Sequence, residues 1–577
     1  MIDVSVAGES ALAPGAVPLR YGVIIDRDTL PAWQRAVIDQ LAEGGDAVLA
    51  LLLRGEEVNP PDRAAREDSL WRLYNNGLVA RRARCVERAG SWRDVAPSVP
   101  IMRIRVARRG KWSQYVEEDD LARVVDVRLD FVLRFGLGII RGALLDAARY
   151  GVWSFHHDDE RVIRGGPPAF WEVNDGLATS GVVLQRLTDR LDGGVPLARA
   201  TFRSVLHSYP RNRDRIFLGA AGLPAQVARA VRIGALDPCA IAVSPSTAPI
   251  RRNPTNREMG RFLARQFGRA ISTRARGVFR ADRWTVGTAQ RPTQMTPNGE
   301  LTVGAVQWLP ERAEDGYFAD PFPAQRDGRT AILVEEFDER ENRGVISALE
   351  QCGSRWEVRS AVIDPGVHAS YPFVMSNGGE LYCIPETAQA GGVDIWRCIE
   401  FPTRWVRVQR LVDGVALVDP TIFTLGEQWW LVGTLKDDEP DTKLHAWSAP
   451  ALFGPWTPHP LNPVKIDVCS SRPAGTPFRL DGDLYRPAQD CSTAYGAAVV
   501  CNRVVSLDER GLVEEPVGRL RAVPGRYASG SHTLSSWNGL WVVDGRRYAH
   551  SRYRMTRELA ARVRRLTQRR TSTSIAG

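Results

Sequence analysis

Two side chains in the first half of the chain have the types and positions that proton transfer requires. His156 follows an apolar run, Val152–Phe155, that predicts a β-strand, and a tight Arg-Gly-Gly-Pro-Pro turn begins at Arg164. Asp192 lies in an acidic turn after a second predicted strand that begins near Ser180. An imidazole beside a carboxylate can accept and return a proton near neutral pH, so we predict that His156 and Asp192 share a cleft.

The elements around these residues predict an α/β domain of the Rossmann-like type. Residues 22–26 and 47–53 indicate buried strands, and the helix expected between them has a proline, Pro31, at its start. A further strand over 130–134 precedes an apolar, helix-like stretch over 137–150. Strands that alternate with helices favour a parallel sheet, and the ligands of such sheets collect at the carboxyl ends of the strands.

The order of these motifs resembles the catalytic core of the folate-dependent formyltransferases, which include methionyl-tRNA formyltransferase, glycinamide ribonucleotide formyltransferase and the sugar N-formyltransferases. The resemblance covers residues 20–210 and depends on Gly-Val-Trp-Ser-Phe-His156, the turn at 164–168 and Leu-Asp192-Gly-Gly. These enzymes use an asparagine, a histidine and an aspartate to move a formyl group from 10-formyltetrahydrofolate to an amine. The resemblance implies that His156 and Asp192 are catalytic, and it places Ser154 at the asparagine position.

Two departures from the family pattern bear on the chemistry. An amide aimed at a developing oxyanion is worth about a hundredfold to a thousandfold in rate, and the hydroxyl of Ser154 is shorter. The Ser-Leu-Leu-Pro that usually follows the histidine is replaced by His-Asp-Asp-Glu at 157–160, which leaves the shape of the folate and amine pocket open. His156 has an alternative interpretation as a structural histidine at a strand end. His157 and the acidic pair after it fit a polar surface loop as well as a metal site, and no metal site is predicted.

The second half contains a phrase that recurs at a spacing of about fifty residues, which is typical of a radially repeated unit. Each of five copies between 318 and 543 ends in a Gly or Asp-Gly turn and an aromatic-rich strand. We therefore predict a five-bladed β-propeller. First strands line the axis of a propeller, so five side chains should converge there: Asp320, Tyr371, Asp419, Arg472 and His532. Glu386 and Asp490, which end second strands, should approach the same mouth.

The repeat resembles the propellers of glycoside hydrolases of the arabinanase and fructosidase type, and still more the N-terminal domain of plant glucosamine inositolphosphorylceramide transferases. The hydrolases use an aspartate base or nucleophile, a glutamate acid and a second aspartate, and the resemblance implies Asp320, Glu386 and Asp419 as candidates. Arg472 and His532 complete the predicted substrate-binding set. An Asp-Pro at a blade start is explained equally well by a structural turn, and blade aromatics by packing between blades.

Length and charge divide the chain further. For 577 residues we expect the formyltransferase-like domain over 1–210, a helical connector over 211–300, the propeller over 301–550, and a basic helix and tail over 551–577. The net charge of +9 is concentrated in the arginines of the connector and the tail. A solvated or packing face explains such arginines, so nucleic acid is not expected as a partner.

Composition narrows the class of protein. No apolar run has the length of a membrane span and the N-terminus lacks the layout of a signal peptide, so we expect a cytoplasmic protein. The eight cysteines are scattered and indicate neither a zinc site nor disulfides. The leading hypothesis is a formyltransferase-like enzyme that modifies an amine, such as an amino sugar or a glycoconjugate precursor, while the propeller binds carbohydrate. The alternatives are a glycoside hydrolase or glycan-binding protein with a degenerate first half, and two binding modules without turnover.

Overall fold

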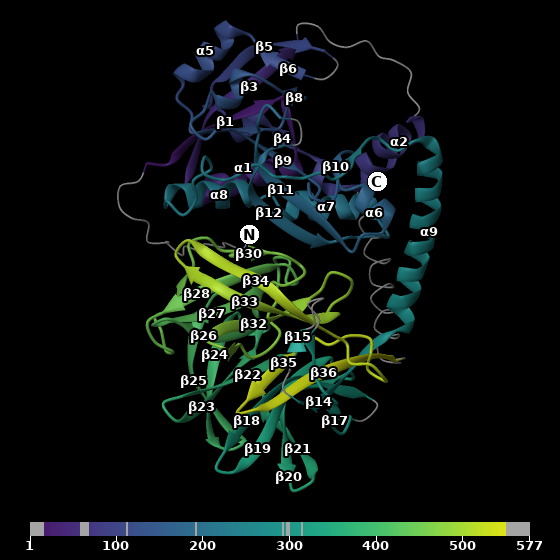
Figure 1. Cartoon of the computed structure of the whole chain (residues 1–577), viewed down its shortest axis with the longest axis vertical. Coiled ribbons are helices and arrows are strands. Elements are labelled where there is room, and N and C mark those ends of the chain that lie inside the picture. The colour runs from purple at the N-terminus through teal and green to yellow at the C-terminus, as the bar shows by residue number, and fades with distance from the viewer. Residues whose placement is uncertain are drawn as a thin grey trace, which may run out of the picture. The chain divides into compact units, whose positions relative to one another are not determined.

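The computed structural model describes residues 17–57, 68–110, 113–190, 193–290, 294–295, 301–312 and 315–549. The chain divides near Arg269 into two compact units, which are called the N-terminal unit and the C-terminal unit (Figure 1). Within the described ranges, no helix combines the length and the apolar sequence that crossing a membrane requires. The basic helix predicted for 551–577 lies outside the described residues.

A mixed, mostly parallel sheet forms the centre of the N-terminal unit. Its described strands lie in the order β12 (Val195–Arg203), β11 (Thr179–Arg186), β9 (Val152–His156), β7 (Phe131–Arg134), β1 (Leu19–Ile25), β3 (Ala47–Glu57), β5 (Ile101–Arg109), β6 (Ser113–Val116) and β8 (Ile139–Ile140). β1 pairs in parallel with β3 on one side and with β7 on the other, and β7 pairs in parallel with β9. The predicted α/β fold is therefore confirmed.

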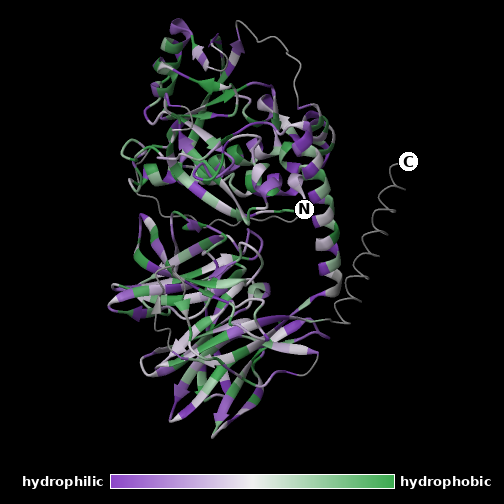
Figure 2. Cartoon of the chain, turned by 45° about the vertical axis from the view of Figure 1, so that its right-hand side comes forward, coloured by the Kyte–Doolittle hydropathy of each residue, from purple (hydrophilic) through white to green (hydrophobic). Residues whose placement is uncertain are grey.

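The central strands are held by a continuous apolar core. Ile24, Leu53, Val132 and Val152, on four different strands, are fully buried in one cluster. Figure 2 shows hydrophobic residues along these strands in green. Each such side chain contributes about 1.5–3 kcal/mol on burial, so the strand ends that follow it are held in fixed positions.

The helix predicted over 137–150 is wrong. Leu137 and Gly142 have positive φ angles of 63° and 75°, a backbone conformation that interrupts a helix. Ile139 and Ile140 instead form the short strand β8, which pairs with β6, and only a single turn of 3-10 helix follows at Ala143–Asp146. The apolar residues of this stretch thus join the sheet and its core rather than one helical face.

The helices of the N-terminal unit include α1 (Ala32–Gly44), α4 (Trp92–Val95), α5 (Glu118–Asp126), α6 (Trp171–Asp175), α7 (Tyr209–Gly219) and α8 (Leu223–Arg232). The long helix α9 (Asn256–Phe279) begins in this unit and ends in the other. The predicted connector over 211–300 is therefore not a separate part of the fold. Its helices α7 and α8 belong to the N-terminal unit, and its last residues form a strand of the propeller.

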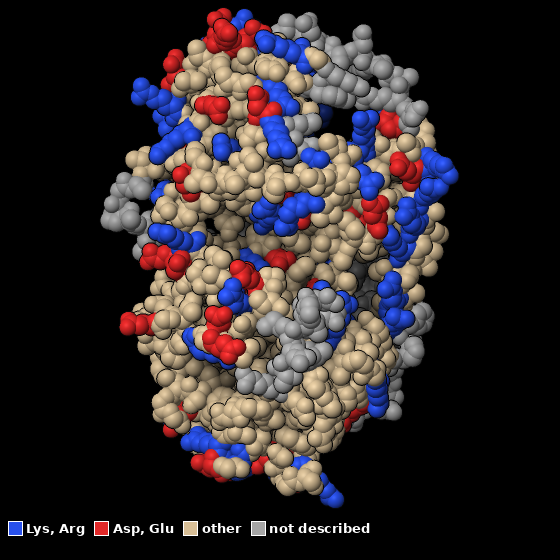
Figure 3. Space-filling view, viewed as in Figure 1, with Lys and Arg blue, Asp and Glu red and all other residues tan. Residues whose placement is uncertain are grey.

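Packing explains part of the arginine-rich sequence of α9. Arg265 donates a hydrogen bond to Asn174 Oδ1 at 3.2 Å, and Arg269 donates to the Val173 carbonyl at 2.6 Å, both on α6. Arg257, Arg261 and Arg274 are exposed, and Figure 3 shows basic side chains along the position of this helix. Helix α9 is thus both a packing element and a solvated basic face.

The C-terminal unit is a five-bladed β-propeller, as predicted. In the described residues, blade one consists of β18 (Gly316–Arg326), β19 (Arg329–Asp338), β20 (Arg343–Cys352) and β21 (Arg355–Ile363), and blade two of β22 (Ser370–Asn377), β23 (Glu380–Glu386), β24 (Gly392–Glu400) and β25 (Arg404–Asp413). Blade three consists of β26 (Leu417–Leu425), β27 (Gln428–Leu435), β28 (Lys443–Ala449), β29 (Thr457–Pro458) and β30 (Lys465–Ile466). Blade four consists of β31 (Phe478–Leu480), β32 (Asp483–Asp490), β33 (Ala498–Asp508) and β34 (Gly511–Arg521).

The fifth blade closes the ring with strands from both ends of the unit. Its sheet contains β35 (Leu534–Trp537) and β36 (Leu540–Ala549) together with β14 (Ala281–Ala289) and β17 (Gln307–Trp308). β14 pairs antiparallel with β36 along its whole length. The propeller therefore starts at residue 281 instead of 301, and the long ladder between β14 and β36 ties its two ends together.

The first strands of blades one to three share a bulge next to the axis. Asp320, Tyr371 and Asp419 each precede a proline, and their φ angles are 51°, 44° and 51°. The register of each first strand shifts at this point against its neighbour. A left-handed residue other than glycine costs about 1–3 kcal/mol and persists only where its surroundings hold it, and a bulge redirects a side chain. The X-Pro repeat in the sequence thus marks the bulges that redirect these side chains at the axis.

Tyr371 links three blades at the axis and should be important for stability. Its hydroxyl contacts Thr421 Oγ1 at 2.9 Å in blade three and accepts a hydrogen bond from the Gly475 N–H at 2.7 Å before blade four. Tyr371→Phe leaves that buried N–H unsatisfied, so we expect a loss of about 1–3 kcal/mol in the free energy of unfolding, measured by chemical denaturation. Tyr382→Phe, on β23 of the same blade, is the matched control. Equal stability of the two variants would contradict this role.

Candidate functional site

The carboxyl ends of the central strands surround a pocket in the N-terminal unit. The chain passes from β1 to β3 and β5 on one side and then returns to β7 on the other side of β1. Loops that leave β1 and β7 therefore diverge, and such a switch point is where open α/β sheets bind ligands. A cavity of about 360 Å³ lies here, lined by Ile25 and Asp26 after β1 and by Phe135 after β7.

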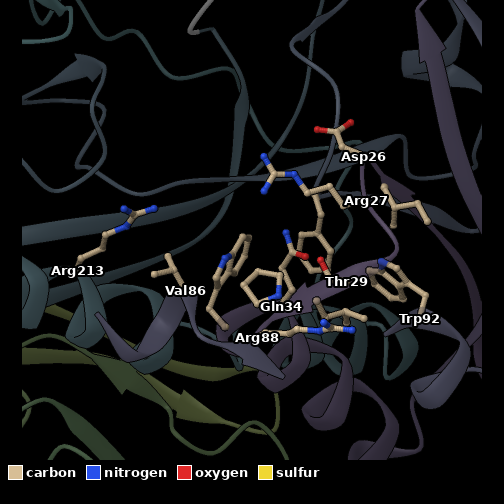
Figure 4. Close-up of a pocket in the computed structure, with 13 residues that line it drawn as sticks. Asp26, Arg27, Thr29, Gln34, Val86, Arg88, Trp92 and Arg213 are labelled. Carbon is tan, nitrogen blue, oxygen red and sulfur yellow. The ribbon is translucent and has the colours of Figure 1, made fainter. Parts of the chain in front are cut away.

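The lining of this pocket, called the arginine pocket below, combines basic and aromatic side chains (Figure 4). Arg27 follows β1, Arg88 begins β4 (Arg88–Ser91), and Arg213 comes from α7. No salt bridge of these arginines is present among the described residues. Trp33 and Trp92 supply aromatic walls. Arg213 also donates to Asn75 Oδ1 at 3.4 Å and lies over the Phe217 ring. Guanidinium groups beside aromatic faces suit a ligand with an anionic group and an apolar or sugar-like body.

The amino end of α1 adds to the positive character of the arginine pocket. Trp33 and Gln34, in the first turn of α1, line the pocket, and the first turn has no acidic residue. Pro31 stands before the helix and carries no capping side chain. The amino end of a helix bears partial positive charge from its unpaired N–H groups, so the helix favours an anion at the same place as the arginines.

The structure places Ser154 and His156 on the same face of β9, two residues apart. The hydroxyl of Ser154 accepts a hydrogen bond from Arg134 Nη1 at 3.0 Å. His156 is partly exposed, and its Nε2 lies 3.2 Å from the Ile163 carbonyl. Since a carbonyl only accepts, Nε2 carries the proton and Nδ1 is left as the basic nitrogen. Asp192 lies outside the described residues, so its predicted approach to His156 stays a prediction.

His157 and Asp158 are buried, and their interpretation as a polar surface loop is wrong. The His157 ring stacks on Phe217 at 3.6 Å and meets Trp33 edge-on at 5.3 Å, so it forms part of the wall behind the arginine pocket. Burial, helped by His156 and Arg213, holds the pKa of His157 well below its usual value. His157 is thus a neutral aromatic packing residue.

A buried carboxyl pair consists of Asp158, which follows His157 in the sequence, and Glu172 of α6. Asp158 Oδ1 accepts the Ala169 N–H at 2.9 Å. Burial, and then the neighbouring Glu172, raise the pKa of Asp158 well above its usual value, and burial raises the pKa of Glu172 to about 7. Two adjacent buried carboxyls are stabilised when they share one proton, so protonation lowers the cost of burying this pair beside the turn after His156.

In the propeller, one part of the axial cluster centres on His532. Asp320 Oδ1 lies 3.7 Å from His532 Nε2, and Asp544 contacts His532 Nδ1. Trp284 of β14 stacks on the imidazole at 3.8 Å. Ligand atoms of the three polar residues lie within 4.8 Å of one another, which is close enough to hold a metal ion. Burial lowers the pKa of His532, but Asp544 and Asp320 outweigh it and raise the pKa overall.

The other part of the cluster centres on Asp419. Its Oδ2 accepts hydrogen bonds from Arg472 Nε at 2.6 Å and from Gln489 Nε2 at 3.0 Å. Its N–H donates to Glu386 Oε2 at 3.3 Å. Asp320, Glu386, Asp419, Arg472 and His532, the predicted substrate-binding set, therefore lie in two adjoining groups at the axis. Their role in binding stays a prediction.

Burial shifts the protonation of this cluster. It raises the pKa of Asp320 to about 6 although His532 acts in the opposite direction, and it raises the pKa of Asp419 to about 7 against the effect of Arg472. Carboxyl groups with such pKa values can donate as well as accept protons near neutral pH. The axis of the propeller thus combines carboxyl groups of raised pKa with a strained backbone.

Sequence reasoning missed Glu335 of β19, which belongs to the same cluster. Burial, and then Asp320, Glu386 and Asp419, raise its pKa well above the usual value. Glu335 follows Asp320 at the same spacing as Glu386 follows Tyr371, so a blade-by-blade alignment would have found it. The arginine pocket was also missed because its residues come from four separate segments that no motif connects.

Comparison with known proteins agrees with this division of the chain. Residues 307–543 match the family model "Glucosamine inositolphosphorylceramide transferase 1, N-terminal". Glucosamine inositolphosphorylceramide transferase 1 of Oryza sativa subsp. japonica is 33% identical over 204 residues, which are 34% of this chain and 26% of that protein. The chain therefore spans about a quarter of the length of this relative.

Methionyl-tRNA formyltransferase of Geobacillus sp. (strain WCH70) is 24% identical over 161 residues, 26% of this chain and 48% of that protein. Among solved structures, glycinamide ribonucleotide transformylase 1 from Symbiobacterium toebii aligns with 41% of this chain and 99% of its own, at 16% identity and a TM-score of 0.28. A family 117 glycoside hydrolase, Zg3597 of Zobellia galactanivorans, aligns with 47% of this chain and 91% of its own, at 14% identity and a TM-score of 0.29. The chain thus combines a formyltransferase-like domain with a propeller of the glucosamine inositolphosphorylceramide transferase type.

Proposed function

We propose that the N-terminal unit transfers a formyl group from 10-formyltetrahydrofolate to the amino group of an acceptor that carries an anionic group, such as a phosphorylated amino sugar. The observation that carries the proposal is the arginine pocket at the switch point of the sheet. Trp33 lines this pocket and contacts His157, which directly follows His156 in the sequence. The similarity to methionyl-tRNA formyltransferase supports the reaction class. The folate is consumed as formyl donor and is treated as a substrate.

In the proposed reaction, separate groups of the N-terminal unit bind the acceptor and move its proton. The acceptor's anion would bind Arg27, Arg88 and Arg213, which leaves its amine directed to the strand ends. The unprotonated Nδ1 of His156 would take a proton from the attacking nitrogen, while the Ile163 carbonyl holds the ring in that tautomer. Asp192 would support the imidazolium that results, as the family resemblance implies.

His156 should carry the proton transfer. His156→Gln keeps a side chain able to donate to the Ile163 carbonyl but has no base, so we expect kcat to fall about a hundredfold to ten-thousandfold. The measurement is tetrahydrofolate release with a panel of amino sugar phosphates. His368→Gln, which alters a partly exposed histidine of the propeller, is the control. Undiminished turnover in His156→Gln would eliminate the proposed role.

The arginine pocket should select acceptors by charge. Arg27→Ala and Arg88→Ala each remove a charged hydrogen-bond donor, worth about 1.5–3 kcal/mol, so KM for a phosphorylated acceptor should rise about tenfold to a hundredfold. KM for the same acceptor without phosphate should stay unchanged. Arg20→Ala, at an exposed arginine on β1 outside the pocket, serves as the matched control. A uniform loss with both acceptors would argue for a structural role instead.

A second candidate function belongs to the propeller. We propose that its axial carboxyl groups bind or cleave a glycan, supported by the raised pKa values of Asp320 and Asp419 near the Arg472 guanidinium. The propeller's relatives are named as glucosamine inositolphosphorylceramide transferases, which supports a glucosamine-containing ligand. In a combined protein, the propeller would hold the sugar part of a substrate that the N-terminal unit formylates.

The protonation of the cluster makes the propeller's stability depend on pH. A carboxyl whose pKa is raised on folding destabilises the fold when ionised, so this cost is absent below about pH 4 and complete above about pH 7. The raised pKa of His532 acts in the same direction, because its contribution is lost as the pH rises through that pKa. Stability of β18 should therefore fall from pH 5 to pH 8.

Asp320→Asn keeps the left-handed backbone but removes the charge, so the decrease should shrink by about 1–3 kcal/mol. Hydrogen exchange of peptides from β18, at several pH values, measures it after correction for intrinsic rates. Asp327→Asn, an exposed residue with φ of 52°, is the matched control. A pH dependence identical in both variants would show that Asp320 ionises normally.

A further inference from the structure

Arg134, at the end of β7, occupies the space beside Ser154. The two residues are direct partners in the parallel pairing of β7 and β9, so their side chains extend from the same face of the sheet. Arg134 Nη1 donates to Ser154 Oγ at 3.0 Å. His156 lies two residues further along β9 and therefore on this face as well.

The loop after β7 holds the guanidinium in place. Arg134 Nη2 donates to the carbonyls of Leu137 at 3.0 Å and Gly138 at 2.7 Å. The loop is fixed in turn by Asp26, whose Oδ1 accepts the Leu137 N–H at 2.7 Å. A Cβ at Gly136 would lie 2.4 Å from the same carboxylate oxygen, so only glycine fits there. This guanidinium is thus oriented by backbone carbonyls before any substrate arrives.

Its charge is not neutralised by contact. Within the described ranges, Arg134 makes no ion pair, and its buried Nε has no hydrogen-bond partner. Asp26 is the carboxylate that acts on it electrostatically, and that carboxylate is engaged with the loop. A preorganised cation with no ion-pair partner among the described residues, next to a strand end with a histidine, has the arrangement expected for stabilising a negative charge that appears during a reaction.

We propose that Arg134 is a catalytic residue that stabilises the oxyanion formed on the formyl oxygen, in place of the asparagine that the family has at the position of Ser154. The inference depends on the proposed formyl transfer. The acceptor nitrogen forms a bond to the formyl carbon, and the carbonyl π electrons move to the oxygen. The guanidinium of Arg134 stabilises the negative charge that this oxygen then carries. The carbonyl then re-forms as the bond from carbon to N10 of the folate breaks.

The proton balance closes without another reactant. His156 removes the proton from the attacking nitrogen, and N10 of the folate takes up a proton with the electron pair it receives. The products are a formamide and tetrahydrofolate. Ser154, which accepts its hydrogen bond from Arg134, acts as a positioning residue for the guanidinium.

The test exchanges one oxyanion donor for the other. Arg134→Ala should lower kcat about a hundredfold to a thousandfold with little change in KM for folate or acceptor. Arg134→Lys should retain part of the rate. In the double variant Arg134→Ala, Ser154→Asn, the amide has the space that the guanidinium leaves, and we expect at least a tenfold gain over Arg134→Ala alone. Arg88→Ala, in the arginine pocket, should instead change KM for the phosphorylated acceptor.

The outcomes separate this inference from the proposed function. A wild-type protein that forms the formamide, with Arg134→Ala equally fast, would overturn the role of Arg134 and leave formyl transfer intact. A loss confined to KM for the folate would also overturn it, because it would indicate substrate binding. A wild-type protein inactive with every acceptor, with activity appearing in the double variant, would overturn both, since Arg134 would then block the site. Recovery in the double variant from an active wild type supports both.

Discussion

The parallel pairing of β1, β7 and β9 is the constraint on which the proposed site depends. In this register Ile24 is opposite Arg134, and Arg134 is opposite Ser154, so one row across three strands ends at the groups that would perform the chemistry. Because side chains alternate along a strand, a slip of one residue would place Phe155 beside Arg134 and send Ser154 to the other face. The closely packed side chains of these strands, which are buried on both faces of the sheet, oppose such a slip because it would move each of them into a space shaped for its neighbour.

The same sheet separates two kinds of binding. Arg134 and Ser154 lie on one face, whereas Phe135 follows Arg134 and lines the arginine pocket with Trp33 from α1. His156 lies on the same face as Arg134 and Ser154, at the carboxyl end of β9, and the next residue, His157, stacks on Phe217 in the aromatic wall behind the pocket. In the proposed reaction an anionic acceptor would therefore reach the strand ends from the side of α1, and the oxyanion would form on the other side. The propeller positions its polar residues in a different way: strained X-Pro bulges on the first strands bring carboxyl groups from separate blades together at the axis.

Much of the fold could be predicted because it follows periodic patterns. The strand before His156, the helix after Pro31 and the repeat of the propeller all appear in the sequence as runs or spacings. The helix over 137–150 failed because positive φ angles at Leu137 and Gly142 depend on loop contacts that apolar periodicity does not encode. The strand β14 was missed because its partner, β36, lies at the far end of the chain. The proposed roles of Arg134 and Arg213 could not be predicted from the sequence around them, because those roles depend on strands and loops that come from other parts of the chain.

The central claim is that the N-terminal unit makes a formamide. Incubation with 10-formyltetrahydrofolate labelled with ¹³C in the formyl group, and with glucosamine 6-phosphate and related amino sugar phosphates, tests it most directly by mass spectrometry of the acceptor. The account predicts an acceptor heavier by one labelled formyl group, formed in step with tetrahydrofolate. Unlabelled acceptors throughout the panel, with the folate either intact or hydrolysed to formate, would contradict it.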